Sequence, residues 1–376
     1  MAVLSYTDLE CMTAGHALTL LGVVPLGAIR HEETRLRVWQ EQGCHGEMGY
    51  MGRDPELFTH PERLLEQARS IVSFAVRYSS RAHPARPQGF GRVARYAWGR
   101  DYHQVLPQRL EALLGDVATN VGSRPAVRIF SDAVPLLERA VAARTGSGFI
   151  GKNTMFIRSG VGSHFFLAEV LWDIEVVDVP AERHSTGRCG ECTRCLQRCP
   201  TNAFVAPYIL DARRCISYLS IEKRGDLNVP ERRMLGEWLF GCDVCQEACP
   251  FNHSAHEADL AEFEEEGGVG PLVELVQVLS LRSSEAFKKR FQGTPLMRAK
   301  REGLLRNAAC VAANTRAEPL VGILAKAAIE DPAAVVRKTC LWAHAQLSGS
   351  RALLEARRTV EEPVVVEEIE ALLASH

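Results

Sequence analysis

One cysteine-rich stretch, from Cys189 to Pro250, limits what this chain can fold into more than any other feature. It opens with Cys189-x2-Cys192-x2-Cys195-x3-Cys199-Pro200, passes a lone Cys215, and closes with Cys242-x2-Cys245-x3-Cys249-Pro250. The first run has the spacing of bacterial ferredoxins, in which three thiolates bind one iron-sulfur cluster and the fourth, before a proline, binds the other. The spacing therefore predicts two 4Fe-4S clusters, with the ligand sets Cys189, Cys192, Cys195 and Cys249, and Cys199, Cys215, Cys242 and Cys245.

Two other uses of cysteine compete with this interpretation. A zinc ribbon needs two Cys-x2-Cys pairs about 15 to 20 residues apart, and it leaves Cys195, Cys199, Cys215 and Cys249 unexplained. A disulfide framework needs an oxidising compartment, which nothing in the sequence indicates. Four cysteines lie outside the motif, and the apolar helical patterns around the last two indicate small core residues: Cys11, Cys44, Cys310 and Cys340.

Composition and charge describe a globular protein. The 376 residues are 46% hydrophobic and 24% charged, enough for two or three cores. The formal net charge of -2 does not indicate a polyanion partner, so any contact with nucleic acid has to come from a local basic patch. The stretch Met1 to Glu10 has neither a secretory nor a twin-arginine signal, and no run approaches about 18 apolar residues. We therefore expect a cytoplasmic protein without a membrane span.

Residues 1–180 alternate between helical and strand patterns, which favours an α/β or α+β domain. Helices are predicted over 63–70, 103–119 and 135–144, the last with Pro135 at its start, and strands over 71–78, 126–130 and 165–172. The run Gly146-x-Gly148-x-x-Gly151 follows a helix rather than a strand, so it lacks the context of a dinucleotide-binding fold. A structural loop explains it equally well.

Three further segments follow this domain. Residues 181–255 hold the cluster motif, and residues 256–302 form a linker and a basic segment, in which the acidic stretch 257–266 is expected to be solvated. From Leu281 to Arg306 there are eight basic residues and two acids. A solvated helix face is the usual explanation for such a run, but its place next to a redox centre favours contact with phosphates.

Residues 303–376 predict stacked helices. The helical patterns cover 304–313, 320–329 and 333–347, and the Asp331-Pro332 turn before Val335-Val336-Arg337 is typical of a HEAT-like repeat. Because so short an array cannot bury its apolar faces alone, we expect it to pack on what precedes it.

Asp132 is the candidate proton donor. It follows the predicted strand 126–130, and the carboxyl ends of strands are where α/β sheets place their ligand crevices. A carboxyl group kept protonated there could donate to a departing oxygen. The alternative is that Asp132 caps the helix predicted to start near Pro135.

Seven motifs, taken with the cysteines, resemble epoxyqueuosine reductase over nearly the whole chain. They are Ser131-Asp132-Ala-Val-Pro-Leu-Leu-Glu138, Gly148-Phe-Ile-Gly-Lys-Asn-Thr154, Gly162-Ser-His-Phe-Phe-Leu167, Ser217-Tyr-Leu-Ser-Ile-Glu222, Phe240-Gly-Cys-Asp-Val-Cys-Gln246, Gly293-Thr-Pro-Leu296 and Gly303-Leu-Leu-Arg-Asn-Ala308. The resemblance implies a three-part architecture: an α/β (α+β) cobalamin-binding domain, a ferredoxin-like domain with two 4Fe-4S clusters, and C-terminal HEAT-like helices.

The resemblance also implies an activity, the reduction of epoxyqueuosine to queuosine at the wobble position of tRNA. Electrons would pass through the two clusters to base-off cobalamin, Asp132 would donate a proton, and His103 of Asp101-Tyr-His103 would be structural or line a pocket. The implied corrin contacts are Arg53, Tyr96, Asp132, Lys152, Asn153, Ser163, Ser217 and Tyr218. The implied contacts with tRNA phosphates are Lys288, Arg290, Arg298, Lys300, Arg301 and Arg306.

Two other functions fit parts of the pattern. A cobalamin-dependent reductive dehalogenase also joins a corrin domain to two clusters, but it is typically exported with a twin-arginine signal and has no need of a basic patch. An iron-sulfur electron carrier needs the clusters and a partner protein, and takes up no cobalamin. For the enzyme we expect a monomer, served by an electron donor that the sequence does not identify.

Overall fold

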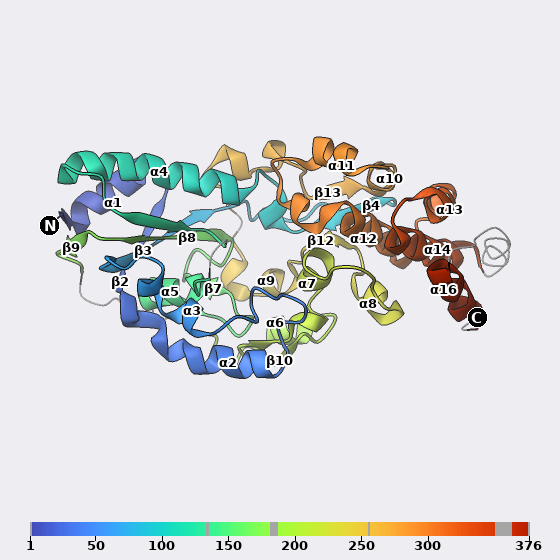
Figure 1. Ribbon diagram of the computed structural model, residues 1–376, viewed down its shortest axis with the longest axis horizontal. Helices are drawn as coiled ribbons and strands as arrows, with labels where there is room; N and C mark the ends of the chain where they lie inside the picture. Colours follow the sequence, from blue (N-terminus) through green and yellow to red (C-terminus); the bar gives the residue numbers. More distant parts are fainter. Residues whose placement is uncertain (1, 133–134, 181–186, 255, 350–362, 375–376) are drawn as a thin grey trace. The chain divides into compact units, whose positions relative to one another are not determined.

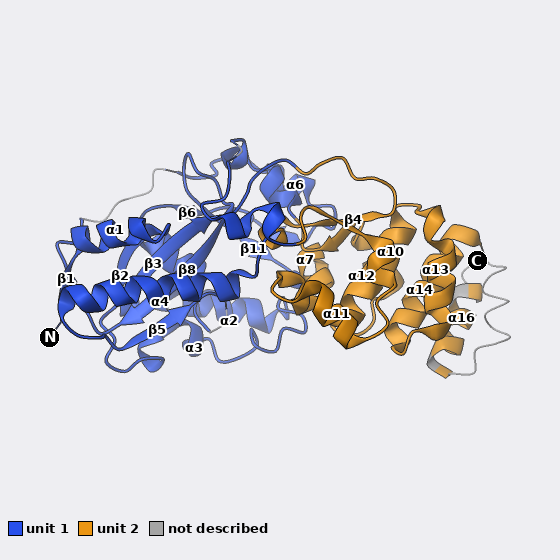
Figure 2. Cartoon of the chain, turned by 90° about the horizontal axis from the view of Figure 1, so that it is seen from above, with its two compact units in different colours: residues 1–82, 99–212, 243–268 blue, residues 83–98, 213–242, 269–376 orange. Residues whose placement is uncertain are grey.

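The computed structural model describes residues 2–132, 135–180, 187–254, 256–349 and 363–374 (Figure 1). They form two compact units that alternate along the chain (Figure 2). Unit 1 comprises residues 1–82, 99–212 and 243–268, and unit 2 comprises residues 83–98, 213–242 and 269–376. The four consecutive segments expected from the sequence divide the chain differently and remain a prediction. Parts of three predictions lie outside the described residues. They are the start of the cluster segment at residue 181, residues 133–134 of the Asp132 motif, and residues 350–362 and 375–376 of the last segment.

A four-stranded sheet is the centre of unit 1. Its order is β2-β3-β8-β5, and every neighbouring pair is antiparallel. The inner strands β3 and β8 are buried along nearly their whole length, which explains their almost continuous apolar sequences. The strands predicted over 71–78, 126–130 and 165–172 are confirmed. The bounds are β2 Thr19–Pro25, β3 Ser70–Arg77, β5 Val127–Phe130 and β8 Phe165–Trp172.

Helices cover both faces of this sheet (Figure 1). α1 (Tyr6–Gly15) and α4 (Tyr102–Val121) lie over one face, and α5 (Glu138–Arg144) packs on the other. The helix predicted over 103–119 is confirmed as α4, which begins after Asp101, whose side chain accepts a hydrogen bond from the His103 amide. An antiparallel sheet has no common carboxyl edge, so the parallel-sheet argument for a crevice at Asp132 does not apply here.

Two predicted helices differ from the structure. The segment 63–70 contains the end of a short 3-10 turn, η2 (Pro61–Arg63), and the first residue of β3, but no helix. The chain enters the sheet here, where the Arg69 amide donates to the Trp172 carbonyl at 2.8 Å. Helix α5 begins at Glu138 rather than at Pro135. Pro135 is therefore part of the loop between β5 and α5.

The remaining elements of unit 1 are short. Strands β1 and β9 pair in parallel, and β6–β7 and β10–β11 are antiparallel pairs. The bounds are β1 Val3–Ser5, η1 Leu26–Glu32, α2 Glu33–Glu41, α3 Glu56–Thr59, β6 Phe149–Ile150, β7 Phe156–Ile157, β9 Glu175–Val177, α6 Arg194–Arg198, β10 Phe204–Ala206, β11 Ile209–Leu210, α9 Val244–Glu247, η5 Pro250–Asn252, η6 Ala261–Phe263 and η7 Glu265–Gly267.

The acidic stretch 257–266 is not the solvated linker that its charge predicted. Phe263 is 1% exposed and its ring lies 4.7 Å from that of Phe166 on β8, between ring centroids. Glu262 accepts a 2.9 Å hydrogen bond from Arg109 of α4. The acids of this stretch are exposed or partly exposed, whereas its apolar residues Leu260 and Phe263 are buried in unit 1.

Unit 2 is mainly helical. It contains a three-stranded sheet of order β12-β4-β13, and the helices predicted over 304–313, 320–329 and 333–347 are confirmed as α12, α13 and α14, which pack on one another. Among the described residues no helix has the length and apolar character of a bilayer span. The bounds are β4 Phe90–Val93, η3 Arg95–Ala97, η4 Ala212–Arg214, α7 Ile216–Ile221, α8 Val229–Met234, β12 Trp238–Phe240, β13 Leu272–Glu274, α10 Leu275–Leu279, α11 Ser284–Phe291, η8 Pro295–Ala299, α12 Lys300–Asn314, η9 Glu318–Leu320, α13 Val321–Glu330, α14 Ala334–Ser348 and α16 Pro363–Ala374.

Candidate active site and cluster-binding segment

The four cysteines predicted to bind the first cluster all lie in unit 1. Burial raises the pKa of the Cys195 thiol, and the neighbouring Cys189 and Cys249 add to the rise. Burial likewise raises the pKa of Cys249, and there Cys189 and Cys192 contribute. These electrostatic effects between thiols indicate that Cys249 lies near the first three cysteines, although it follows them by more than fifty residues in the sequence. The fold thus brings Cys249 within electrostatic range of the first three cysteines, as the crossover ligand of a ferredoxin-type motif requires.

Backbone amides point at the sulfur atoms of this segment. The Lys152 amide donates to Cys189 Sγ at 3.3 Å, and the Ala203 amide donates to Cys199 Sγ at 3.3 Å. Hydrogen bonds to sulfur stabilise negative charge on a ligand thiolate and help to set the reduction potential of a cluster. The local structure thus fits a bound iron-sulfur centre.

The second predicted ligand set is divided between the two units. Cys199 and Cys245 belong to unit 1, whereas Cys215 and Cys242 belong to unit 2. Cys215 immediately precedes α7, and Cys242 follows β12 after a glycine with φ of +70°. The grouping of these four cysteines into one cluster remains a prediction from the ferredoxin spacing.

Two of the cysteines outside the motif are core residues, as their sequence context predicted. Cys310 on α12 and Cys340 on α14 are fully buried. Burial raises the pKa of the Cys310 thiol to about 12 and raises that of Cys340 as well. Both remain protonated and unreactive at neutral pH.

Asp132 lies directly after β5 and its carboxylate is held by α4. Tyr102 at the start of α4 donates from its hydroxyl to Asp132 Oδ2 at 2.8 Å, and His103 Nε2 lies 4.0 Å from the same oxygen. The Asp132 side chain is 71% exposed, so it is open to a substrate. Because the residue before α5 is Leu137, Asp132 does not cap that helix, and the capping alternative is excluded.

The backbone of Asp132 has the left-handed conformation, with φ of +57°. This conformation costs a residue with a side chain roughly 1–2 kcal/mol, less for aspartate than for most. Its amide donates to Glu138 Oε1 at 2.6 Å. The surroundings therefore hold Asp132 through both its backbone and its side chain.

A second carboxyl group lies behind this contact. Burial raises the pKa of Glu138 to about 8, and the Asp132 carboxylate adds to the rise. Glu169, on β8, is fully buried and accepts a 2.9 Å hydrogen bond from Ser73. Burial and the proximity of Glu138 raise the pKa of Glu169 well above its ordinary value, against the opposing effect of Ser73. In both glutamates the raised pKa favours the neutral carboxyl group over the carboxylate.

Comparisons with known proteins agree with the motifs. A family model described as 4Fe-4S double cluster binding domain matches residues 188–252, which include all eight motif cysteines, and one described as epoxyqueuosine reductase QueG, DUF1730 matches residues 59–133. The epoxyqueuosine reductase of Xanthomonas campestris is 36% identical over 84% of this chain and 88% of its own length, and that of Pseudomonas aeruginosa is 38% identical over 83% and 86%. This chain belongs to the epoxyqueuosine reductase family.

Solved structures of family members share the fold. An epoxyqueuosine reductase crystallised with a tRNA-Tyr epoxyqueuosine-modified stem loop matches with a TM-score of 0.87 and 30% identity, covering 97% of this chain and 96% of that one. The Bacillus subtilis enzyme, in a form with its catalytic aspartate loop swung out of the active site, matches with a TM-score of 0.84 and 30% identity over 97% and 98%. The epoxyqueuosine reductase fold therefore extends over both units.

Three of the corrin contacts that the family resemblance implies lie beside the cluster-binding segment in unit 1. Lys152 donates from Nζ to the Gly190 carbonyl at 2.7 Å, and Asn153 Nδ2 lies 3.5 Å from the Cys245 carbonyl. Ser163 is buried, with its hydroxyl donating to Gln246 Oε1 at 2.9 Å. A cofactor next to these residues would be close to a cluster.

The other implied corrin contacts are distributed over both units. Arg53 and Asp132 are exposed residues of unit 1, and Tyr96, Ser217 and Tyr218 belong to unit 2. Next to Asp132, the Ser131 hydroxyl is buried and makes no hydrogen bond within the described part of the chain. An unsatisfied buried hydroxyl beside this candidate proton donor fits a polar ligand at this place.

The structure corrects two of the six implied tRNA contacts. The Arg301 guanidinium is buried, donates to Asp331 Oδ1 at 3.1 Å and makes a second contact with Asp331 Oδ2. Arg306 is 1% exposed and donates to the backbone carbonyls of Leu219, Lys223 and Gly225. Both guanidinium groups are buried and hydrogen-bonded within unit 2, so they cannot reach a phosphate.

The four other basic residues remain candidates for tRNA contact. Lys288 and Arg290 are exposed on α11, and Lys300 is exposed at the start of α12. Arg298 is half-exposed and makes a two-pronged ion pair with Glu222, at 2.8 and 2.9 Å.

Three residues of this site were not predicted from the sequence: Tyr102, Glu138 and Glu169. Tyr102 lies in the Asp101-Tyr-His103 run, in which only His103 was considered as a pocket residue. Glu138 ends the Asp132 motif but has no distinctive spacing. Glu169 carried a usable signal, because it is the one charged residue in the apolar run Phe165–Trp172, and a lone carboxyl group in a buried strand is rarely accidental.

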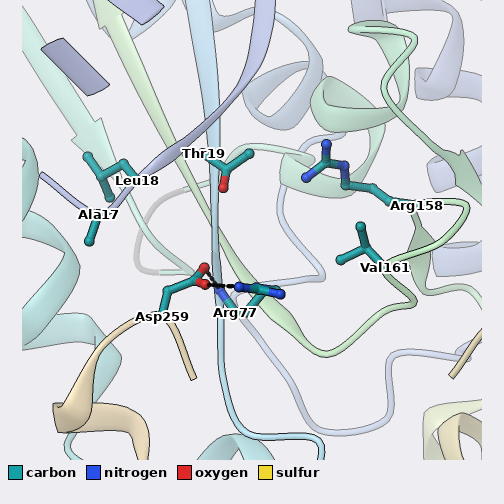
Figure 3. A pocket seen from close by; sticks show the side chains of 7 residues that line it. All are labelled: Ala17, Leu18, Thr19, Arg77, Arg158, Val161 and Asp259. Carbon is teal, nitrogen blue, oxygen red and sulfur yellow. Dashed lines mark hydrogen bonds and ion pairs between the residues drawn. The ribbon is translucent and has the colours of Figure 1, made fainter. Parts of the chain in front are cut away.

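A cavity of about 330 Å³ lies elsewhere in unit 1 (Figure 3). Its rim contains the Arg77–Asp259 ion pair, at 2.7 Å, with Arg158 on the opposite side. Its lining is Ala17, Leu18, Thr19, Arg77, Arg158, Val161 and Asp259. None of the residues implied for the reaction lines it, so this cavity is separate from the candidate active site.

Proposed function

We propose that this protein reduces epoxyqueuosine to queuosine in the anticodon loop of tRNA, as its relatives' names state for them. The observation that carries the proposal is the joint occurrence, in a chain of this family, of the double-cluster motif and an exposed aspartate held at the end of β5. A reductive dehalogenase and an electron carrier share the clusters with this protein, but neither accounts for the family relationship over more than four fifths of the chain.

The overall reaction takes two electrons and two protons for each epoxide, and the oxygen leaves as water. In the proposed mechanism the cluster cysteines hold the centres through which electrons arrive one at a time. Bound cobalamin would supply the reducing cobalt, and Lys152, Asn153, Ser163, Ser217 and Tyr218, with Arg53 and Tyr96, would hold the corrin. Asp132 would donate a proton to the departing oxygen while Tyr102 keeps its carboxyl group oriented.

The proposed substrate enters as part of a tRNA loop. Single-stranded loops expose bases that a protein can reach, and a base splayed out of the anticodon could approach the exposed Asp132 carboxyl. Exposed Lys288, Arg290, Arg298 and Lys300 would contact tRNA phosphates. The HEAT-like assignment of the C-terminal helices, a cytoplasmic location, a monomeric state and a separate electron donor belong to the same proposal.

The decisive experiment is reconstitution under anaerobic conditions. The protein is loaded with iron, sulfide and cobalamin, incubated with epoxyqueuosine-containing tRNA and a strong reductant, and the nucleosides are then identified by mass spectrometry. The expected result is loss of one oxygen from the modified nucleoside, only when cobalamin is present. A protein that binds eight iron atoms, takes up no cobalamin and leaves the tRNA unchanged would instead be an electron carrier.

A further inference from the structure

We propose that Glu138 is the positioning residue for the proton donor, because its carboxyl oxygen accepts the Asp132 amide hydrogen and holds Asp132 in the conformation that directs its side chain to Tyr102. The inference rests on the proposed function, since it assigns Asp132 the role of donor. It adds a residue that touches neither substrate nor cofactor and acts through Asp132.

The geometry of the hydrogen bond supports this role. The Asp132 amide lies 2.6 Å from Glu138 Oε1, and Asp132 has φ of +57°, a conformation that a residue with a side chain keeps only where its surroundings impose it. Leu137, the residue before α5, provides no side-chain cap. The first carboxyl group of α5 is thus turned back toward the end of β5 and fixes the start of the loop between them.

The electrostatic surroundings of Glu138 indicate that it acts as a neutral acceptor. Burial, with a smaller contribution from the Asp132 carboxylate, raises the pKa of Glu138 to about 8. A neutral carboxyl group accepts the amide hydrogen without placing a full negative charge beside the proton donor.

Besides Asp132, the described charged groups near Glu138 come from α5, β8 and η1. Arg139, its neighbour on α5, acts against the rise in pKa, and β8 contributes Glu169, which is itself buried. The packed turn η1 carries Arg30 and His31, which pair with Glu62 and Glu32. Because the raised pKa favours the neutral form of Glu138, glutamine is its closest replacement in both shape and charge.

A relative has been solved with its catalytic aspartate loop displaced. The Bacillus subtilis enzyme has been solved with its catalytic aspartate loop swung out of the active site. Glu138, which holds the backbone of Asp132, is therefore placed to set the fraction of molecules in which the Asp132 carboxyl group is in position.

The test compares Glu138→Gln with Glu138→Ala in the reconstituted holoenzyme. Glutamine keeps an acceptor oxygen, so we expect kcat within about threefold of the wild type. Alanine removes the acceptor, and a donor displaced by about 1 Å costs on the order of 100-fold in kcat, with KM for the tRNA unchanged. Glu111→Ala is the matched control, because Glu111 is exposed on α4 and makes only a surface ion pair with Arg124.

Hydrogen–deuterium exchange at the Asp132 amide gives a readout that does not depend on turnover. We expect exchange to be faster in Glu138→Ala and unchanged in Glu138→Gln, with the iron content of both variants equal to that of the wild type. If the wild type fails to reduce the tRNA, the proposed function is wrong while the exchange result still decides whether Glu138 holds the loop.

Two results would overturn the inference. One is wild-type kcat and wild-type exchange in Glu138→Ala. The other is a Glu138→Gln variant as impaired as Glu138→Ala, which would mean that the ionisable proton of Glu138, rather than its acceptor oxygen, is what the reaction needs.

Discussion

The Tyr102 hydroxyl donates a 2.8 Å hydrogen bond to Asp132 Oδ2, and the Tyr102 ring stacks on two neighbouring rings. Phe166 of β8 stacks on it with centroids 4.4 Å apart and His103 stacks with centroids 4.1 Å apart. Because a stacked, buried ring has little freedom, the hydroxyl is fixed in space by the packing of α4 on the sheet. The core of unit 1 therefore determines where the exposed carboxylate of Asp132 points.

Removing this hydroxyl should impair the reaction without unfolding the protein. Tyr102→Phe keeps the stacked ring but loses a hydrogen bond to a charged group, which is worth about 1.5–3 kcal/mol. We expect kcat to fall about 10-fold to 100-fold in single-turnover assays. In an Asp132→Asn background the same change should cause no further loss, and additive losses would show that the two side chains act separately.

Asp132→Asn should abolish most of the turnover. An amide has nearly the same shape but cannot donate the proton, and one positioned donor contributes about 100-fold to 10000-fold in rate. Iron content and cobalamin uptake should remain those of the wild type. Full activity of this variant would remove Asp132 from the mechanism.

Loss of Cys249 should remove one cluster and spare the other. Its thiol is grouped with the first three cysteines of the motif, so Cys249→Ala should reduce the iron content from about eight atoms to about four. The exposed Cys11, replaced in the same way, should leave the iron content unchanged. An eight-iron Cys249→Ala protein would contradict the ligand assignment.

Glu169 should make the stability of the protein fall as the pH rises. Its pKa in the folded state is raised above its ordinary value of 4.5, so the folded protein keeps a proton that the unfolded chain releases. The stabilisation is complete below about pH 4.5 and is lost as the pH rises toward the folded pKa, by up to about 1.4 kcal/mol per pH unit.

Urea unfolding of the wild type and Glu169→Gln, followed by tryptophan fluorescence from pH 5 to 7, tests this expectation. The amide does not titrate, so the unfolding midpoint of the wild type should decline relative to that of the variant as the pH is raised. Parallel midpoints across this range would mean that Glu169 is ionised in the folded protein.

Substitutions of basic residues in unit 2 should affect either stability or tRNA binding, depending on whether the residue is buried or exposed. Arg301→Ala leaves Asp331 buried without its partner and should cost about 3–5 kcal/mol of unfolding free energy. Lys288→Ala removes an exposed charge and should leave the free energy of unfolding unchanged. It should weaken tRNA binding and lower the slope of log K against log salt concentration by about 1. Equal tRNA affinity for Lys288→Ala and the wild type, at low salt, would remove this lysine from the interface.

Much of the fold and the ligand chemistry could be read from the sequence, because the signals are local. Cysteines separated by two or three residues predicted the clusters, and the apolar runs at 71–78 and 165–172 predicted the two inner strands. The helical period of α12, α13 and α14 was equally direct. Each of these patterns depends only on neighbouring residues and on the period of a strand or a helix.

The tertiary structure decided which polar groups are buried and with whom they pair. Charge predicted that 257–266 would be solvated, and the family resemblance implied that Arg301 and Arg306 would meet tRNA phosphates. The structure instead buries Phe263 of that stretch and both arginines. The residues that pair with these charged groups are distant in sequence. Asp331 is thirty residues from Arg301, and Arg109 is 153 residues from Glu262. Burial is set by the packing of distant elements, so a local pattern cannot report it.

The same distinction runs through the candidate active site. The sequence by itself determined that Asp132 follows a strand within a family motif, and that eight cysteines have ferredoxin spacing. Only the folded chain brings Tyr102 of α4 to the carboxylate of Asp132 and Glu138 of α5 to its amide. The reason is physical: the kinds of groups are written in the order of residues, whereas the environment that gives each group its charge and direction forms when separate elements pack together.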